Sequence, residues 1–65
     1  MAFKFLRLPA VKERTGLSRS SIYLRISEQR FPAPVSLGGR AVAWIEEEIN
    51  DWQNKQIKAS RESVR

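Results

Sequence analysis

The 65-residue chain contains no cysteine and no histidine, and these absences exclude several kinds of site. Without cysteine, it can form neither a disulfide bond nor a thiolate zinc site. Without histidine, it lacks the most common general base and the most common metal-ligating side chain. Its three glycines do not form the glycine-rich phosphate loop of nucleotide-binding proteins. We therefore expect neither an enzyme nor a protein that holds a cofactor, a metal ion or a small-molecule ligand.

Long apolar runs are also absent from the sequence. No apolar stretch approaches the roughly 20 residues that a membrane-spanning helix needs, and the first residues lack the apolar region of a signal peptide. We therefore expect a cytoplasmic protein that makes no membrane contact. The length is enough for one domain with a small hydrophobic core.

Residues 8–30 have the pattern of two short helices joined by a tight turn. Pro9 is tolerated in the first turn of a helix, which predicts a helix over residues 9–14. Gly16 permits the left-handed backbone that ends many helices. Ser18 then suits the N-cap of a second helix, because its hydroxyl can accept an unpaired backbone N–H. The segment therefore has the sequence pattern of a helix-turn-helix.

Two apolar residues flank this N-cap. Leu17 precedes Ser18 and Ile22 follows it by four positions, which is the spacing of a hydrophobic staple that fixes the angle between the helices. Such an angle allows the second helix of a helix-turn-helix to lie in the major groove of DNA. From the turn alone, an αα-hairpin that only packs is the alternative.

Basic residues are concentrated near the two ends of the chain. The net charge is +5, and residues 1–30 alone carry seven basic against two acidic side chains. Residues 31–54 carry a local charge of −3, and residues 55–65 carry +3. A basic helix-turn-helix on a chain of mixed charge is typical of a nucleic-acid binder, whereas evenly mixed signs would indicate an ordinary solvated surface. The charge pattern therefore favours DNA binding.

A β-hairpin is predicted after the second helix. Two prolines make the chain extended before residue 35, and apolar residues then alternate on either side of the double glycine at 38–39. In this hairpin, Val35 and Leu37 would share one face. Val42 and Trp44 would share the facing one, turned to the core. Because an isolated hairpin is marginally stable, it must pack against the helices.

The tip of this hairpin has the residues that a DNA-contacting wing needs. Gly39 is small enough to allow close approach to a phosphate backbone, and Arg40 supplies a positive charge. The tip therefore predicts a wing. A plain structural hairpin with an incidental arginine is the alternative.

Helical spacing returns near the C-terminus. Ile45, Ile49 and Trp52 recur at 3.6-residue intervals, which predicts a third helix over about residues 46–57. The acidic residues at its start and the lysines near its end suit the helix dipole, so residues 46–48 are interpreted as helix-start chemistry and not as a catalytic or metal site. We expect both tryptophans, Trp44 and Trp52, in the core. We also expect one domain over residues 1–58 and a frayed basic tail over residues 59–65.

The expected DNA contacts fall into groups. Arg19, Ser20 and Tyr23 would reach the groove, and the N–H groups at the start of the second helix would meet a phosphate. Cations on the first helix and residues of the wing would add phosphate contacts that are non-specific and sensitive to salt. The full set of candidate DNA-binding residues is Lys12, Arg14, Ser18, Arg19, Ser20, Ser21, Tyr23, Arg25, Gly39 and Arg40.

These residues match a known family pattern. The string Thr15-Gly16-Leu17-Ser18-Arg19-Ser20-Ser21-Ile22-Tyr23 is followed at fixed spacing by Phe31-Pro32, Pro34-Val35, Leu37-Gly38 and Trp44. In these residues the chain resembles the AlpA family of small prophage-encoded regulators, a branch of the MerR-like helix-turn-helix group with ties to phage excisionases. The resemblance extends over residues 5–52.

The resemblance implies a mainly α fold with a small β-hairpin, a winged helix-turn-helix of three helices and a two-stranded wing. It implies a bacterial regulator of transcription that binds double-stranded DNA near prophage or genomic-island genes. An excisionase that bends attachment-site DNA is an alternative within the same resemblance. Since one small domain makes a modest interface, we expect two or more copies to bind adjacent sites.

The chain departs from the family pattern at two positions. Many members have arginine where this chain has Leu24, and glycine where it has Gln29. Helical spacing places Leu24 opposite the core side, so it is predicted to be exposed. There it could contact a thymine methyl group or a partner protein, and a protein-interaction module is therefore a further alternative function.

Overall fold

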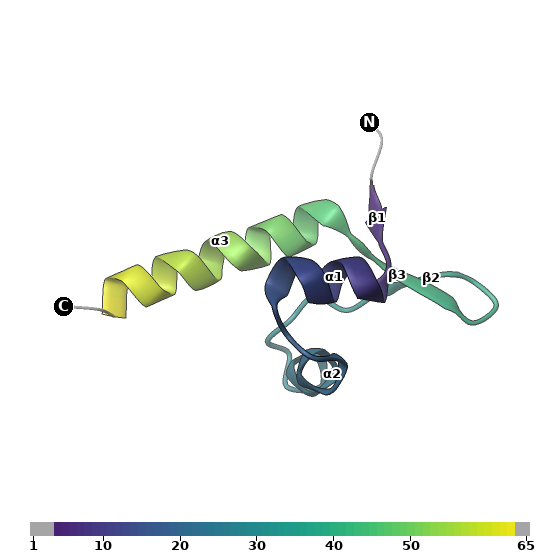
Figure 1. The fold of residues 1–65 in the computed structure, drawn as a ribbon, viewed down its shortest axis with the longest axis horizontal. Coiled ribbons are helices and arrows are strands. Elements are labelled where there is room, and N and C mark those ends of the chain that lie inside the picture. Colours follow the sequence, from purple (N-terminus) through teal and green to yellow (C-terminus); the bar gives the residue numbers. More distant parts are fainter. Residues whose placement is uncertain (1–3, 64–65) are drawn as a thin grey trace.

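The computed structural model describes residues 4–63, which form six helices and strands. In chain order these are β1 (Phe5–Leu6), α1 (Leu8–Thr15), α2 (Arg19–Ser27), β2 (Val35–Gly38), β3 (Ala41–Ile45) and α3 (Glu46–Ser63). In Figure 1, α2 lies below α1 and is seen nearly end-on, and the β2–β3 hairpin and the far end of α3 extend in opposite directions along the long axis. The expected winged helix-turn-helix, mainly helical with a small hairpin, is confirmed.

The turn between α1 and α2 has the geometry that its residues predict. Gly16 adopts the left-handed conformation with φ of 72° and ends α1. The Ser18 hydroxyl accepts the backbone N–H of Ser21 at 3.2 Å and caps α2. Leu17 and Ile22 both pack in the hydrophobic core, as a staple requires. The angle at which α2 leaves the turn is therefore fixed by the Ser18 cap, the buried Ile22 and the partly buried Leu17.

A third strand, not expected from the sequence, completes the sheet. The strand order is β1-β3-β2, and β1 pairs antiparallel with β3 through Phe5 with Ile45 and Leu6 with Trp44. Two residues are too few to show the alternation by which strands are recognised in sequence. The expected two-stranded wing is present as the β2–β3 hairpin, and β1 adds a third strand to the sheet, with β3 at its centre.

The register of the hairpin also differs from the prediction. Ser36 lies opposite Val42, and the pairing shifts before Gly38. Because paired residues lie on the same face, Ser36 shares its face with Val42 and Trp44. Leu37 is 46% exposed. The expectation that Val35 and Leu37 would face Val42 and Trp44 across the hairpin is wrong, because Val35 pairs with Ala43 and Ser36 pairs with Val42.

The core contains residues from the helices, the strands and the linker after α2. Its buried members are Leu6, Val11, Ile22, Phe31, Trp44 and Ile49. Trp44 is fully buried, and its indole N–H donates a hydrogen bond to the backbone oxygen of Pro32 at 2.9 Å. Trp52 is partly buried and packs against the core. The expected core position of both tryptophans is confirmed.

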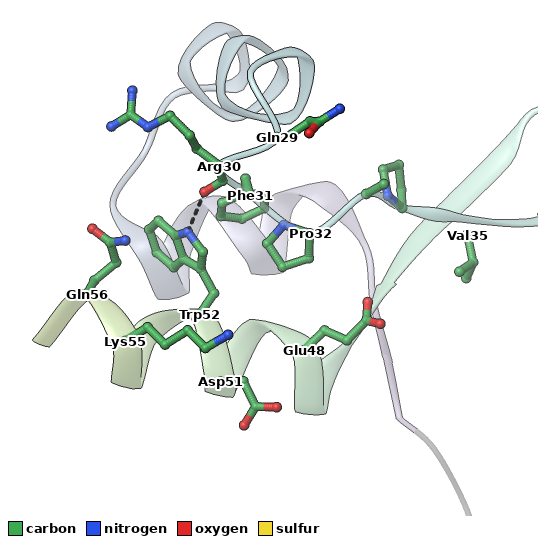
Figure 2. A pocket seen from close by; sticks show the side chains of 12 residues that line it. Gln29, Arg30, Phe31, Pro32, Val35, Glu48, Asp51, Trp52, Lys55 and Gln56 are labelled. Carbon is green, nitrogen blue, oxygen red and sulfur yellow. Dashed lines mark hydrogen bonds between the residues drawn. The ribbon is translucent and has the colours of Figure 1, made fainter. Parts of the chain in front are cut away.

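The linker after α2 lies against α3. Gln29 has a φ of 60°, the left-handed region, and turns the chain out of α2. Its N–H donates to the backbone oxygen of Ile26 at 3.0 Å. Figure 2 shows the indole N–H of Trp52 donating to the backbone oxygen of Arg30, at 2.8 Å. The Phe31 and Trp52 rings meet edge to face, 4.8 Å apart. These contacts fix the end of α2 relative to α3.

The last helix is longer than expected. It continues to Ser63, beyond the expected end near residue 57, and residues 59–63 of the expected basic tail are helical. Residues 64–65 lie outside the described part of the chain. Residues 54–62 are all exposed, so this half of α3 follows the helix propensity of its lysine, glutamine, alanine and arginine residues and not an apolar stripe. Across residues 4–63, no helix is both long and apolar enough to cross a membrane.

Candidate nucleic-acid interface

The start of α2 brings together half of the residues expected to contact DNA. Ser18, Arg19, Ser20 and Tyr23 line one shallow depression in the surface. The Ser18 hydroxyl lies 3.3 Å from that of Ser20 and 3.1 Å from that of Ser21. Hydroxyl groups, a guanidinium and an aromatic ring therefore share one exposed patch at a helix N-terminus.

This patch has a positive electrostatic character. The first turn of α2 contains no acidic residue, and Arg19 is its first residue. A helix N-terminus also carries a partial positive charge from its unpaired N–H groups. The Ser18 hydroxyl accepts one of these N–H groups, that of Ser21. The other N–H groups of the first turn, together with the serine hydroxyls, form a surface suited to a phosphate oxygen.

Arg19 and Tyr23 are in contact within the patch. The guanidinium carbon of Arg19 lies 5.5 Å from the centroid of the Tyr23 ring, within cation–π range. Tyr23 is 37% exposed, and its ring meets the buried Trp44 ring with centroids 6.2 Å apart at an interplanar angle of 65°. The sequence placed Arg19 and Tyr23 on one helical face but gave no signal for the contact with Trp44.

The remaining positions on α2 divide by exposure. Leu24 is 58% exposed, which confirms the prediction that it lies off the core. Arg25 is partly buried, and it is the basic residue of the last helical turn. The exposed polar patch therefore lies on the N-terminal half of α2, and the exposed apolar Leu24 follows it in the sequence.

Arg14 occupies a different environment from the other candidates. Its guanidinium forms an ion pair with Glu46 at 3.0 Å and donates a hydrogen bond to the side-chain oxygen of Asn50. Gln53 donates in return to the backbone oxygen of Arg14 at 2.8 Å. No sequence pattern predicts these contacts, because they join residues more than 30 positions apart. Lys12, on the same helix, is exposed.

The wing tip is exposed and carries one cation. Gly39 has a φ of 56° and, together with Gly38 at 110°, makes the turn. Arg40 is exposed, and no ion pair within residues 4–63 includes it. Glu46, a conceivable partner for Arg40, pairs with Arg14 instead.

Acidic side chains gather on another part of the surface. Glu48 and Asp51 line a hollow between α3 and the linker of residues 29–35, as Figure 2 shows. The hollow has an apolar floor that includes Phe31 and Trp52. Arg30 and Lys55 also line this hollow, so its two carboxylates are balanced by two cations and it has no net positive charge. The start of α2 and the wing tip, in contrast, carry cations and no acidic residue.

Comparison with known proteins assigns the chain to a family. The family model described as prophage CP4-57 regulatory protein (AlpA) matches residues 4–57, a span that contains β1 through most of α3. The chain belongs to the AlpA family. The resemblance inferred from the helix-turn-helix string is therefore confirmed, and AlpA is described as a regulatory protein and not as an enzyme.

Two relatives of this AlpA-family chain illustrate the similarity. It is 48% identical to an uncharacterized protein, ORF88, of Enterobacteria phage P4, over 83% of this chain and 61% of the phage protein. It is 38% identical to the DNA-binding transcriptional activator AlpA of Escherichia coli (strain K12), over 88% of this chain and 90% of that protein. The match thus spans about three-fifths of the phage relative and nearly all of the bacterial one. No solved structure matches the chain significantly.

Proposed function

We propose that this AlpA-family protein is a sequence-specific DNA-binding regulator of transcription, with α2 in the major groove and the β2–β3 hairpin on the backbone. The observation that carries the proposal is the exposed patch of Ser18, Arg19, Ser20 and Tyr23 at the start of α2. The E. coli relative, named as a DNA-binding transcriptional activator, supports the same function. Helix-turn-helix proteins place the N-terminal residues of their second helix against base edges.

The contacts divide into those that read sequence and those that position the protein. Arg19 and Ser20 face base edges, where an arginine can bind guanine through two hydrogen bonds, and Tyr23 lies beside Arg19 in the groove. The amides at the start of α2, with Ser18 and Ser21, hold a phosphate. The cations Lys12, Arg25 and Arg40 and the small Gly39 add backbone contacts.

Of the two cations proposed on α1, Lys12 is the better candidate for a phosphate contact. Lys12 is exposed, whereas Arg14 is held by the Glu46 carboxylate and the Asn50 side chain. A phosphate contact by Arg14 would require those bonds to be broken first. We therefore assign Arg14 to the packing of α1 against α3.

We further propose that two or more copies bind adjacent sites. The patch and the wing tip together form a modest surface on a chain of 65 residues. A single small module gives limited affinity, and neighbouring sites raise it through effective concentration.

A protein-interaction module is the second candidate, favoured by Leu24. An apolar side chain that is 58% exposed beside the polar patch is also suited to a protein partner. This candidate predicts that the protein shows no salt-dependent affinity for DNA.

Nuclease footprinting on the DNA flanking the protein's own gene tests the proposed function. We expect protected segments at discrete sites, with protection lost as salt is raised from about 50 to 200 mM, because phosphate contacts release counterions. Uniform weak protection along the DNA would contradict sequence-specific binding. The absence of any protection at low salt would favour the protein-interaction module.

A further inference from the structure

Three side chains make a continuous set of contacts from the core to the DNA-facing patch. Trp44 is fully buried and its indole N–H is bonded to Pro32 at 2.9 Å. The Tyr23 ring stands edge to face against Trp44, and the Arg19 guanidinium lies 5.5 Å from the centroid of the Tyr23 ring. The exposed Arg19 side chain is thus connected, through the Tyr23 ring, to the buried Trp44.

This arrangement restricts Arg19 before any DNA arrives. A surface arginine samples many rotamers, and a bidentate contact with guanine requires one orientation of the guanidinium plane. A ring under the guanidinium removes part of this freedom in the unbound protein, so less is lost on binding. The four-residue separation of Arg19 and Tyr23 places them on the same helical face.

Tyr23 itself has limited freedom to change its orientation. It is 37% exposed, and its two described ring contacts are those with Trp44 and Arg19. Because both contacts use the ring, removal of the hydroxyl alone leaves them in place. A phenylalanine at this position would therefore keep the arrangement, and an aliphatic residue would lose it.

We propose that Tyr23 is a positioning residue that acts through Arg19. Its ring, held by Trp44, orients the Arg19 guanidinium toward a guanine in the major groove. This proposal rests on the proposed function and assigns the specificity of one base pair to a pair of residues.

Selection from a pool of random-sequence DNA duplexes by the full chain tests the proposal. The wild-type protein should select a site with a preferred guanine at one position. Arg19→Ala should abolish that preference, a loss of roughly 5- to 150-fold in discrimination between guanine and the other bases. Tyr23→Leu should weaken discrimination at that same guanine by about 2- to 5-fold, the size of an exposed cation–π contact. Tyr23→Phe, the matched control, should keep the wild-type preference.

Other outcomes of the selection would overturn the proposal. Full guanine preference in Tyr23→Leu would mean that the ring does not position Arg19. A loss at a different base pair would mean that Tyr23 reads DNA by itself. A loss shared by Tyr23→Phe would assign the effect to the hydroxyl. Arg19→Lys keeps the charge and leaves the core contacts of Tyr23 intact. It should weaken the guanine preference, because lysine lacks the planar fork of a guanidinium, and retain affinity for random DNA.

A measurement without DNA keeps this inference separate from the proposed function. The Arg19 side-chain Nε–H resonance should carry a ring-current shift in the NMR spectrum of the wild-type and Tyr23→Phe proteins. That shift should disappear in Tyr23→Leu, while the amide spectrum shows that the fold is intact. A wild-type Arg19 signal identical to that of Tyr23→Leu would overturn the positioning contact. A failure to select any DNA would instead contradict the proposed function.

Discussion

The guanidinium of Arg14 lies 3.0 Å from the carboxylate of Glu46, and this ion pair joins α1 to the first residue of α3. The two side chains are 33% and 29% exposed, so the pair is only partly screened by water. Asn50 and Gln53 complete the contacts of Arg14 from the same helix. One basic residue of the helix-turn-helix thus serves the packing of the domain, and charge alone did not distinguish it from its neighbours.

Arg14→Ala should therefore lower stability without changing the electrostatics of DNA binding. We expect a loss of about 1–2 kcal/mol in the free energy of unfolding, from one partly exposed ion pair and its hydrogen bonds. The slope of log affinity against log salt should be unchanged. Lys12→Ala is the matched control, and it should keep stability and reduce the slope by about one unit. A reduced slope in Arg14→Ala would return this residue to the DNA surface.

Trp44→Ala should leave the protein largely unfolded at 25 °C. The side chain is fully buried at the centre of the sheet, and its removal leaves a cavity that costs roughly 3–5 kcal/mol. A domain of this size has little more stability than that. Urea unfolding followed by circular dichroism checks the prediction. A cooperative transition at the wild-type midpoint would contradict the buried position of Trp44.

Gln29→Gly should stabilise the protein. Gln29 has a φ of 60°, and a side chain in the left-handed region costs about 1–2 kcal/mol relative to glycine. The greater freedom of glycine in the unfolded chain offsets part of this gain, so we expect a net increase of up to about 1 kcal/mol. Thermal unfolding measures it.

Glu28→Gly is the control for this substitution. Glu28 has a φ of −93°, which any residue adopts, so glycine there should destabilise by about 0.5–1 kcal/mol. Equal effects of the two substitutions would show that the backbone at Gln29 is not strained.

Arg40→Ala should weaken the binding of specific and random DNA to the same extent. If Arg40 contacts a phosphate, its removal releases one counterion fewer and makes the salt plot shallower by about one unit. Arg40→Lys should preserve the slope. Thermal stability should not change, because no ion pair within residues 4–63 includes Arg40. An unchanged slope with a lowered melting temperature would make Arg40 a structural residue.

The features predictable from sequence were those set by neighbouring residues. Features that depend on residues close together in the sequence were predicted. They are the left-handed Gly16, the Ser18 cap and the buried Ile22. The pairing of β1 with β3 and the Arg14–Glu46 contact join segments far apart, and no periodicity in the sequence encodes them. The hairpin pairs Val35 with Ala43 and Ser36 with Val42, and alternation of apolar residues alone cannot fix this register.

The candidate site shows the same division between local features, which were predicted, and long-range contacts, which were not. The composition and spacing of α2 identified its polar face, because helical geometry brings positions 19, 20 and 23 to one side. The support of Tyr23 by Trp44 required knowledge of how the sheet packs under α2. Sequence therefore indicated which side chains are presented, and the structure added what holds them.

An NMR titration of the ¹⁵N-labelled protein with a duplex from its own footprinted site tests most directly which surface binds DNA. We expect amide shift changes concentrated at residues 18–23 and 39–40. Glu48 and Asp51, on the acidic side of α3, should show little change because their carboxylates disfavour phosphate. Changes concentrated on α3, with residues 18–23 unaffected, would contradict the placement of α2 in the groove.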